Sequence, residues 1–201
     1  MMKPFDESLV QIADGFALRL DPRGAGLAQF VDEAIVTLSH GPFKHVGIFG
    51  GDGTYMEQNP PDPMQKTLAG SDRPALFERG LLCHVRLKHI STEQQLRALG
   101  WFQTHLGAQV PYGYLSIVEL GVRGVLESIP ALAGIVEELP NFEDYQDAPV
   151  CSCWDWLGWC YGVGYDWAAP AGIGTGSITP AQFSALITMG ILEVIQDNGT
   201  I

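Results

Sequence analysis

The apolar positions of this chain predict a domain in which short strands are interspersed with amphipathic helices. Segments that are apolar throughout, or that alternate with polar residues, and that end at Gly, Pro or Asp are typical of strands. Five such segments lie at residues 11–20, 45–49, 54–58, 81–87 and 191–195. The sequence Gly50-Gly51-Asp52-Gly53 joins the second segment to the third and has the composition of a tight turn. These two strands are therefore expected to form an antiparallel hairpin.

Helices are predicted where apolar residues recur every three or four positions. Such patterns lie at residues 30–38, 96–106, 115–129 and 182–189. Ser91 and Gln94 form a capping box before the second pattern, and Thr179-Pro180 is a strong start signal before the last one. A further short helix is expected directly after Cys151, where Pro149 lies just upstream.

Strands and helices in this order predict an α+β fold, with a small antiparallel sheet packed against helices. The chain has 201 residues, of which 46% are hydrophobic, so it is long enough to bury a substantial core. We expect one domain over residues 1–201. Residues 59–79 are rich in Pro, Asp and Gly, which predicts an irregular surface loop at about 59–80.

The charge of the chain argues against a nucleic acid partner, and its pattern of apolar residues argues against a membrane span. Asp and Glu number 23 against 11 Lys and Arg, which gives a formal net charge of −12. Such a field repels a phosphate backbone, so no nucleic acid partner is expected. The most apolar long stretch, residues 113–139, is interrupted by Glu119, Arg123, Glu127 and Pro130, so no membrane span is expected.

The N-terminus lacks the basic start and apolar run of a secretion signal. Four cysteines without such a signal are typical of a reducing compartment and of free thiols. We therefore expect a protein located in the cytoplasm of the producing cell or associated with a virion. The sequence does not indicate an oligomeric state.

Cys151 is the first candidate for chemistry. The reactive form of a thiol is the thiolate, and a helix N-terminus or a neighbouring imidazolium favours that form. The sequence places Cys151 at the start of an apolar helix, which supplies the first of these conditions. The alternative is a buried cysteine that only fills space, which is the commoner role of a free cysteine.

His45 and Glu57 are the candidates that would complete such a site. His45 is the first residue of an apolar strand, which would fix the backbone of a general base at that position. The other histidines do not begin such a strand; they are His40, His84, His89 and His105. Glu57 follows on the next strand, and antiparallel pairing across the turn is expected to bring it within reach of the imidazole. A carboxylate there would orient the ring and stabilise the imidazolium. The alternatives are a capping histidine and an exposed strand glutamate.

The order of these motifs resembles a known family. His45-Val46-Gly47-Ile48, Glu57, Pro111-Tyr112-Gly113-Tyr114 and Cys151-Ser152 follow one another along the chain. This order is similar to the circularly permuted branch of the NlpC-type papain-like cysteine hydrolases, in which the histidine strand precedes the cysteine helix. The helix with Tyr-Gly-Tyr-Leu-Ser-Ile and the terminal Thr-Pro-Ala helix look like variants that bacteriophages carry. The resemblance spans residues 13–186 and depends on the joint presence of motifs that are individually unspecific.

The resemblance implies a permuted papain-like fold and a cysteine peptidase or amidase. Cys151 matches the nucleophile, His45 the base and Glu57 the polar orienting residue, with no cofactor and no metal. The implied substrate is a peptide or another amide, and a peptidoglycan peptide is one candidate. The chain departs from the family after Cys-Ser, where Cys153-Trp154-Asp155-Trp156 replaces a helix of small aliphatic residues. This departure makes Cys153 a rival nucleophile.

Three other hypotheses remain open at this point. An acyl-enzyme formed on Cys151 could pass its acyl group to an acceptor other than water. The protein would then be a thiol acyltransferase. The tryptophans near Cys151 could fill the cleft, which would leave an inactive binding or virion-structural module. A metal site formed by Cys151, Cys153, Cys160 and His84 is disfavoured, because this spacing does not match the paired Cys-x-x-Cys units of structural zinc.

Overall fold

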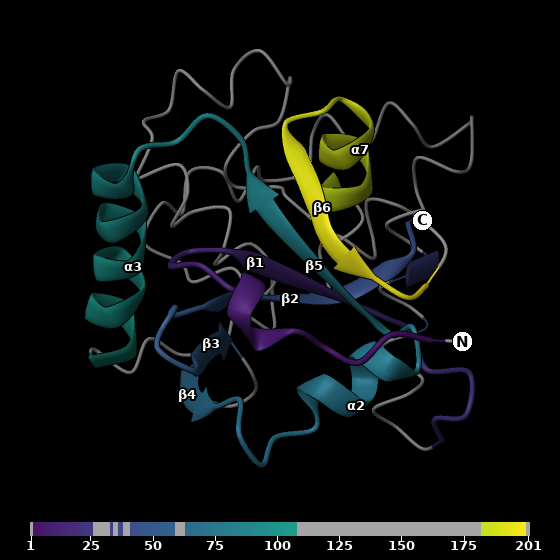
Figure 1. The fold of residues 1–201 in the computed structure, drawn as a ribbon. Helices are drawn as coiled ribbons and strands as arrows, with labels where there is room; N and C mark the ends of the chain where they lie inside the picture. Colours follow the sequence, from purple (N-terminus) through teal and green to yellow (C-terminus); the bar gives the residue numbers. More distant parts are fainter. Residues whose placement is uncertain are drawn as a thin grey trace, which may run out of the picture.

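Six antiparallel strands form one sheet at the centre of the computed structural model (Figure 1). The structure describes residues 2–25, 33, 36–37, 41–58, 63–107 and 182–199. Within them the strand order across the sheet is β4-β3-β2-β1-β5-β6. The strands are β1 (Gly15–Arg19), β2 (Phe43–Phe49), β3 (Thr54–Gln58), β4 (Pro63–Thr67), β5 (Leu82–Leu87) and β6 (Leu192–Asp197).

The pairing of the strands confirms an α+β fold with a small antiparallel sheet. Strand β1 lies in the middle and pairs with β2 on one side and β5 on the other. Strand β6 comes from the C-terminal end of the chain and pairs with β5. The sheet therefore joins segments from both ends of the sequence.

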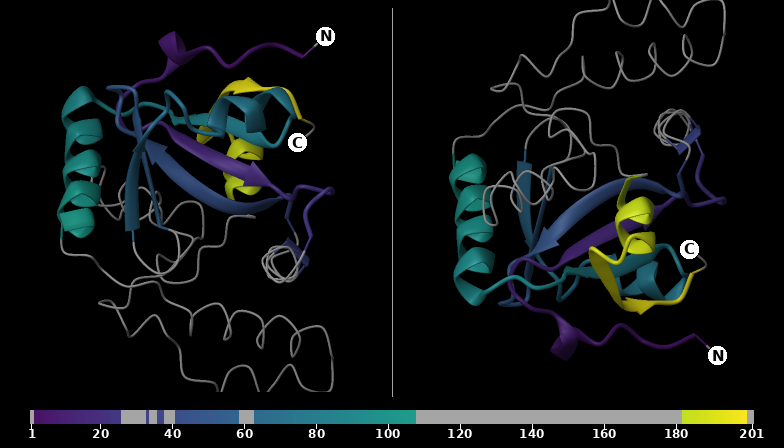
Figure 2. Two further views of the ribbon diagram at one scale, coloured as in Figure 1. Left: turned by 90° about the horizontal axis from the view of Figure 1, so that it is seen from below. Right: turned by 90° about the horizontal axis from the view of Figure 1, so that it is seen from above.

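The two faces of the sheet are covered by different elements. Helices α3 (Thr92–Gly107) and α7 (Gln182–Thr188) contribute to the core on one face. Helix α2 (Arg73–Glu78) and the N-terminal segment, residues 3–10 with the short 3-10 helix η1 (Glu7–Leu9), cover the other. Figure 2 shows β1 and β2 running side by side, with the N-terminal segment along the outer edge in both views.

Alternation along the strands sorts the apolar side chains into two clusters. Ala17, Val46 and Ile48 belong to the cluster that α3 and α7 cover. The second cluster, which we call the α2-side cluster, consists of Phe16, Leu18, Phe49, Tyr55, Leu68, Phe77 and Leu82. This division follows from the two-residue period of a strand, which sends successive side chains to opposite faces.

The predicted hairpin between β2 and β3 is confirmed. Ile48 pairs with Met56 and Phe49 with Tyr55. Gly51 and Gly53 both have a φ of +79°, a left-handed conformation that glycine adopts at little cost. Asp52 Oδ1 accepts hydrogen bonds from the backbone N–H of Thr54 at 3.1 Å and from its hydroxyl at 2.5 Å.

The capping box before α3 is also confirmed. The Gln94 side chain accepts from the Ser91 backbone N–H at 2.8 Å, and the Ser91 hydroxyl accepts from the Gln94 N–H at 3.2 Å. The other predicted strands are present with shifted ends, since the first is limited to Gly15–Arg19 and the last extends to Asp197.

The expectation of an irregular loop at about residues 59–80 is wrong for the described part of that range. Strand β4 pairs with β3, and helix α2 follows it. The two prolines in the described part of this range lie at positions that tolerate a proline. Pro63 is the first residue of the outermost strand, and Pro74 lies in the first turn of α2.

Several predicted elements lie outside the described residues. These are the helix at residues 115–129, the helix that follows Cys151, and most of the helix at residues 30–38. In the part of the chain that the structure does describe, no helix has the length and apolar character needed to cross a membrane.

Candidate functional site

His45 and Glu57 lie next to each other on the face of the sheet that α2 covers. His45 Nε2 is 3.2 Å from Glu57 Oε2. If the register Ile48–Met56 is continued by one residue, Glu57 lies opposite Gly47 and diagonally adjacent to His45. The predicted proximity of the two side chains is therefore confirmed, and their role in a reaction stays a prediction.

A third residue, Arg73, completes this group. Arg73 lies in the first turn of α2, and its Nη2 donates to the same Glu57 Oε2 that contacts His45. The side chains of Glu57 and Arg73 are 0% and 8% exposed, whereas that of His45 is 15% exposed. We refer to His45, Glu57 and Arg73 as the His–Glu–Arg group.

The charges of the group make Glu57 a permanent carboxylate near neutral pH. Burial alone would raise the pKa of the Glu57 carboxyl, because a charge is poorly solvated there. The hydrogen bond and charge of His45 and the guanidinium of Arg73 outweigh this effect and lower the pKa to about 2. A carboxylate can only accept hydrogen bonds, so His45 Nε2 carries the proton in this contact.

The orientation of His45 leaves its second ring nitrogen free for chemistry. Nε2 is committed to Glu57, and no hydrogen bond joins Nδ1 to another residue within the described part of the chain. In the tautomer with a proton on Nε2, Nδ1 has a lone pair and can accept a proton. The site can therefore supply a general base whose orientation is fixed by a buried carboxylate.

Gly47 allows the aromatic residues beneath the group to pack closely. A Cβ at position 47 would lie 2.2 Å from Cζ of Phe16, so any other residue would displace that ring. Phe16 in turn contacts Tyr55 edge to face, with ring centroids 5.8 Å apart. These two rings form the surface on which the Arg73 guanidinium lies, at 5.3 Å from the Phe16 centroid and 5.1 Å from the Tyr55 centroid.

A second histidine and carboxylate pair lies in the same structure. His84 Nε2 is 2.8 Å from Asp14 Oδ2, and both side chains are almost fully buried. Arg86 also binds Asp14, through Nε and Nη2 at 2.7 Å each. His84 Nδ1 accepts from Gln196 Nε2 at 3.0 Å, so both ring nitrogens of His84 have partners. This arrangement is that of a structural network.

The metal-site hypothesis gains no support from these residues. Within the described residues there is no group of three or more His, Cys, Asp or Glu that could hold a metal ion. Cys83, the described free cysteine, is fully buried, and burial raises the pKa of its thiol to about 12. Such a thiol is unreactive near neutral pH.

The other predicted site residues belong to parts of the chain that the structure does not describe. Cys151, its rival Cys153 and Cys160 all lie outside the described residues, as does His40. The structure therefore brings together two of the three predicted catalytic residues, His45 and Glu57. It adds Arg73, which sequence reasoning missed because it assigned that segment to a loop.

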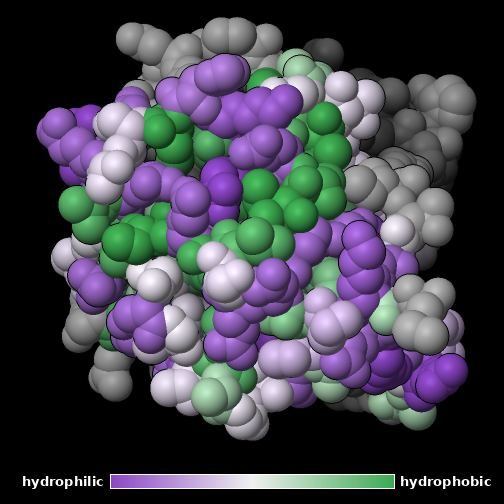
Figure 3. Space-filling view, viewed as in Figure 1, coloured by the Kyte–Doolittle hydropathy of each residue, from purple (hydrophilic) through white to green (hydrophobic). Residues whose placement is uncertain are grey.

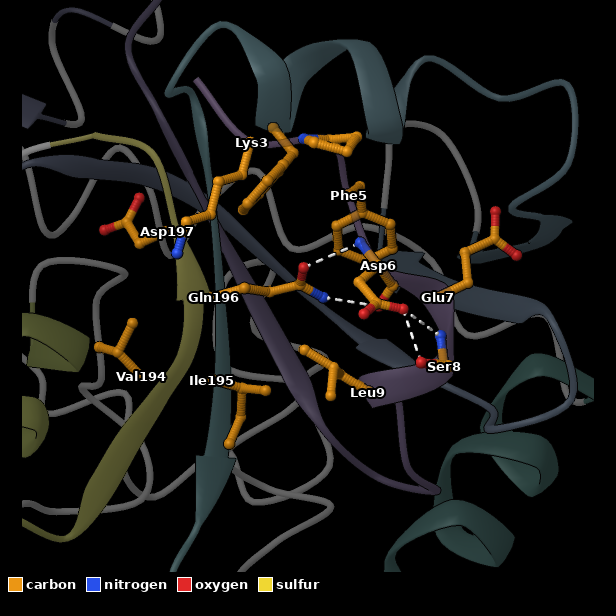
Figure 4. Close-up of a pocket in the computed structure, with 12 residues that line it drawn as sticks. Lys3, Phe5, Asp6, Glu7, Ser8, Leu9, Val194, Ile195, Gln196 and Asp197 are labelled. Carbon is orange, nitrogen blue, oxygen red and sulfur yellow. Dashed lines mark hydrogen bonds between the residues drawn. The ribbon is translucent and has the colours of Figure 1, made fainter. Parts of the chain in front are cut away.

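A separate cavity of about 910 Å³ lies between the N-terminal segment and β6. Figure 4 shows Gln196 reaching across it to the backbone of Asp6, which it binds through both amide atoms at 3.0 Å. Asp197 at its rim is paired with Arg19. Figure 3 shows polar and apolar residues intermixed on this side of the molecule. The cavity contains no member of the His–Glu–Arg group, and we assign no function to it.

The described residues thus define an α+β protein with a buried His–Glu–Arg group on one face of an antiparallel sheet. Comparison of the chain with models of known protein families, with curated proteins and with solved structures finds no match.

Proposed function

We propose that this protein is a cysteine hydrolase that cleaves an amide bond, with Cys151 as nucleophile, His45 as base and Glu57 as orienting residue. The observation that carries the proposal is the contact of His45 Nε2 with the ionised, buried Glu57, which leaves Nδ1 available. A base fixed by a third group is the arrangement that activated nucleophiles require. The fold that goes with this function is the permuted papain-like fold that the motif order resembles.

The reaction would proceed through an acyl-enzyme. His45 Nδ1 takes the proton of the Cys151 thiol, and the sulfur attacks the amide carbonyl carbon. The C–N bond then breaks, and the amine leaves with the proton that the imidazolium returns. Water, deprotonated by the same nitrogen, hydrolyses the thioester to a carboxylic acid and restores the thiol. Backbone N–H groups at the start of the Cys151 helix would hold the oxyanion, a contribution of about 3 to 4 kcal/mol per donor.

The proposed substrate class is a peptide or another amide, and a peptidoglycan peptide is one member of it. Transfer of the acyl group to a second nucleophile would use the same steps up to the thioester. The acyltransferase alternative therefore shares the site and differs only in the acceptor.

Site-resolved labelling with iodoacetamide tests the proposal. The native protein is labelled from pH 5 to pH 9, and each cysteine is followed by mass spectrometry. We expect rapid modification of Cys151 at the acidic end, and we expect His45→Ala to abolish that early reaction. Cys83 is the internal control, because its buried thiol, with a pKa of about 12, stays unlabelled.

Two results would redirect the proposal. Early, His45-dependent labelling of Cys153 in place of Cys151 would move the nucleophile by two residues and leave the mechanism intact. If no cysteine reacts until the pH nears about 8.5, which is the pKa of an ordinary thiol, the hydrolase proposal is refuted. The inactive binding or virion-structural module then becomes the better hypothesis.

A further inference from the structure

Arg73 makes more contacts than an arginine in an exposed surface ion pair. Its Nη2 donates to Glu57, and its guanidinium lies against the rings of Phe16 and Tyr55. The side chain is 8% exposed, and α2 fixes its backbone. A stacked, planar guanidinium has little freedom to leave its partner. The structure therefore keeps one positive charge permanently at Glu57.

That permanent charge changes what His45 can do. A fully buried carboxylate is strongly destabilised unless a cation neutralises it. If His45 were the sole cation, the pair would retain one proton, and it would reside on the imidazole because that is the more basic group. An arginine never loses its proton in proteins. With Arg73 present, Glu57 has a countercharge whether His45 is charged or neutral.

We propose that Arg73 is a positioning residue that keeps Glu57 ionised and thereby allows His45 to release and regain a proton. This inference rests on the proposed function, in which His45 must do both in each turnover. It assigns Arg73 no contact with the substrate. Its role is to prevent His45 and Glu57 from becoming locked as a buried ion pair.

The other ionisable groups near the site have lesser roles. Asp72 lies 3.4 Å from Arg73 Nη1, but its side chain is 69% exposed, so water screens its charge. Burial raises the pKa of the Tyr55 phenol, which therefore stays neutral near pH 7. On β1, the residue paired with His45 is Leu18, which carries no charge. Glu57 and Arg73 are thus the charges that face His45 from the described elements.

The chain offers a closely matched control for the removal of a buried arginine. Arg19 binds Asp197 with contacts of 2.9 and 2.5 Å and lies 5.3 Å from the centroid of the Phe43 ring. Its side chain is 10% exposed, and its Nε is buried without a hydrogen-bond partner within the described residues, as is that of Arg73. Phe43 belongs to the core on the other face of the sheet. Changes at Arg19 should therefore affect stability without affecting His45.

The test is an NMR titration of the five histidine rings, with His45 assigned by comparison with His45→Gln. Arg73→Gln keeps a hydrogen-bond donor but removes the charge, whereas Arg73→Lys keeps the charge. We expect Arg73→Gln to raise the midpoint of the His45 titration by about one pH unit, a roughly tenfold change in proton affinity. Arg73→Lys and Arg19→Gln should leave it near the wild-type midpoint.

The outcomes separate this inference from the proposed function. If Arg73→Gln and Arg19→Gln give the same His45 midpoint while Cys151 still shows early, His45-dependent labelling, Arg73 is only structural and the hydrolase proposal stands. If neither Cys151 nor Cys153 of the wild type shows early, His45-dependent labelling, the hydrolase proposal fails whatever the histidine titrations show. Should Arg73→Gln not fold, the Arg73→Lys variant decides, because a midpoint that moves with the charge retained contradicts the inference.

Discussion

The ionised Glu57 should make a measurable part of the stability of this protein depend on pH. The folded-state pKa of Glu57 is about 2, against an ordinary value of 4.5. Because the folded value is depressed, the stabilisation is fully present above pH 4.5 and is lost as the pH falls through 2. A difference of about 2.5 units corresponds to about 3.4 kcal/mol at pH 7, of which about 1.4 kcal/mol remains at pH 3.

The variant Glu57→Gln isolates this contribution from that of the other carboxylates. It cannot ionise, and it leaves His45 and Arg73 without their anion, so we expect it to be less stable than the wild type by about 3 kcal/mol or more at pH 7. That gap should narrow by about 2 kcal/mol at pH 3, where the wild type has lost the same amount. Urea denaturation followed by circular dichroism at both pH values gives the two gaps.

The matched control is Glu78→Gln, on the exposed side of α2. A surface substitution of this kind should change the free energy of unfolding by no more than about 0.5 kcal/mol at either pH. A gap between wild type and Glu57→Gln that is equal at pH 7 and pH 3 would refute the reasoning, because Glu57 would then not be the group that titrates.

Three further predictions concern the surroundings of the site. Gly47→Ala should destabilise the protein by about 1 to 3 kcal/mol in urea denaturation, because its Cβ would overlap the ring of Phe16; a variant as stable as the wild type would mean that the ring moves freely. Cys83 should react with iodoacetamide only after denaturation, since burial raises its pKa to about 12, and labelling of the native protein would contradict that burial. Gln196→Ala should speed limited proteolysis of the N-terminal segment, because it removes both hydrogen bonds to Asp6; unchanged cleavage rates would show that other contacts hold the segment.

Local sequence signals predicted the parts of the site that depend on local structure. The glycine-rich turn fixes the register of β2 and β3, and that register brings Glu57 to His45. Two strands joined by a short turn leave few alternative pairings, so the alternation of side chains could be applied directly. The capping box before α3 could also be predicted, because it joins Ser91 and Gln94, which are only three positions apart in the sequence.

Arg73 could not be predicted in this way. It is separated from Glu57 by 16 residues, and its position depends on how α2 packs against the α2-side cluster. Helix α2 spans only Arg73–Glu78, which is too short for apolar periodicity to be visible. A Pro- and Asp-rich composition is compatible both with a loop and with an edge strand followed by a short helix that has Pro in its first turn. Tertiary packing decides between these two structures.

The two histidine and carboxylate pairs show which features distinguish a candidate base from a structural histidine. His84 is fully buried, both of its ring nitrogens are bonded, and its carboxylate partner is also bound twice by Arg86. A proton on Nδ1 of His84 would break the bond from Gln196, and the ring has no exposed surface. His45 shares the same kind of carboxylate and arginine partners but keeps 15% exposure and one unbonded nitrogen within the described residues. The unbonded Nδ1 and the partial exposure of the ring, and not the presence of a nearby carboxylate, are therefore the reasons for proposing His45 as the base.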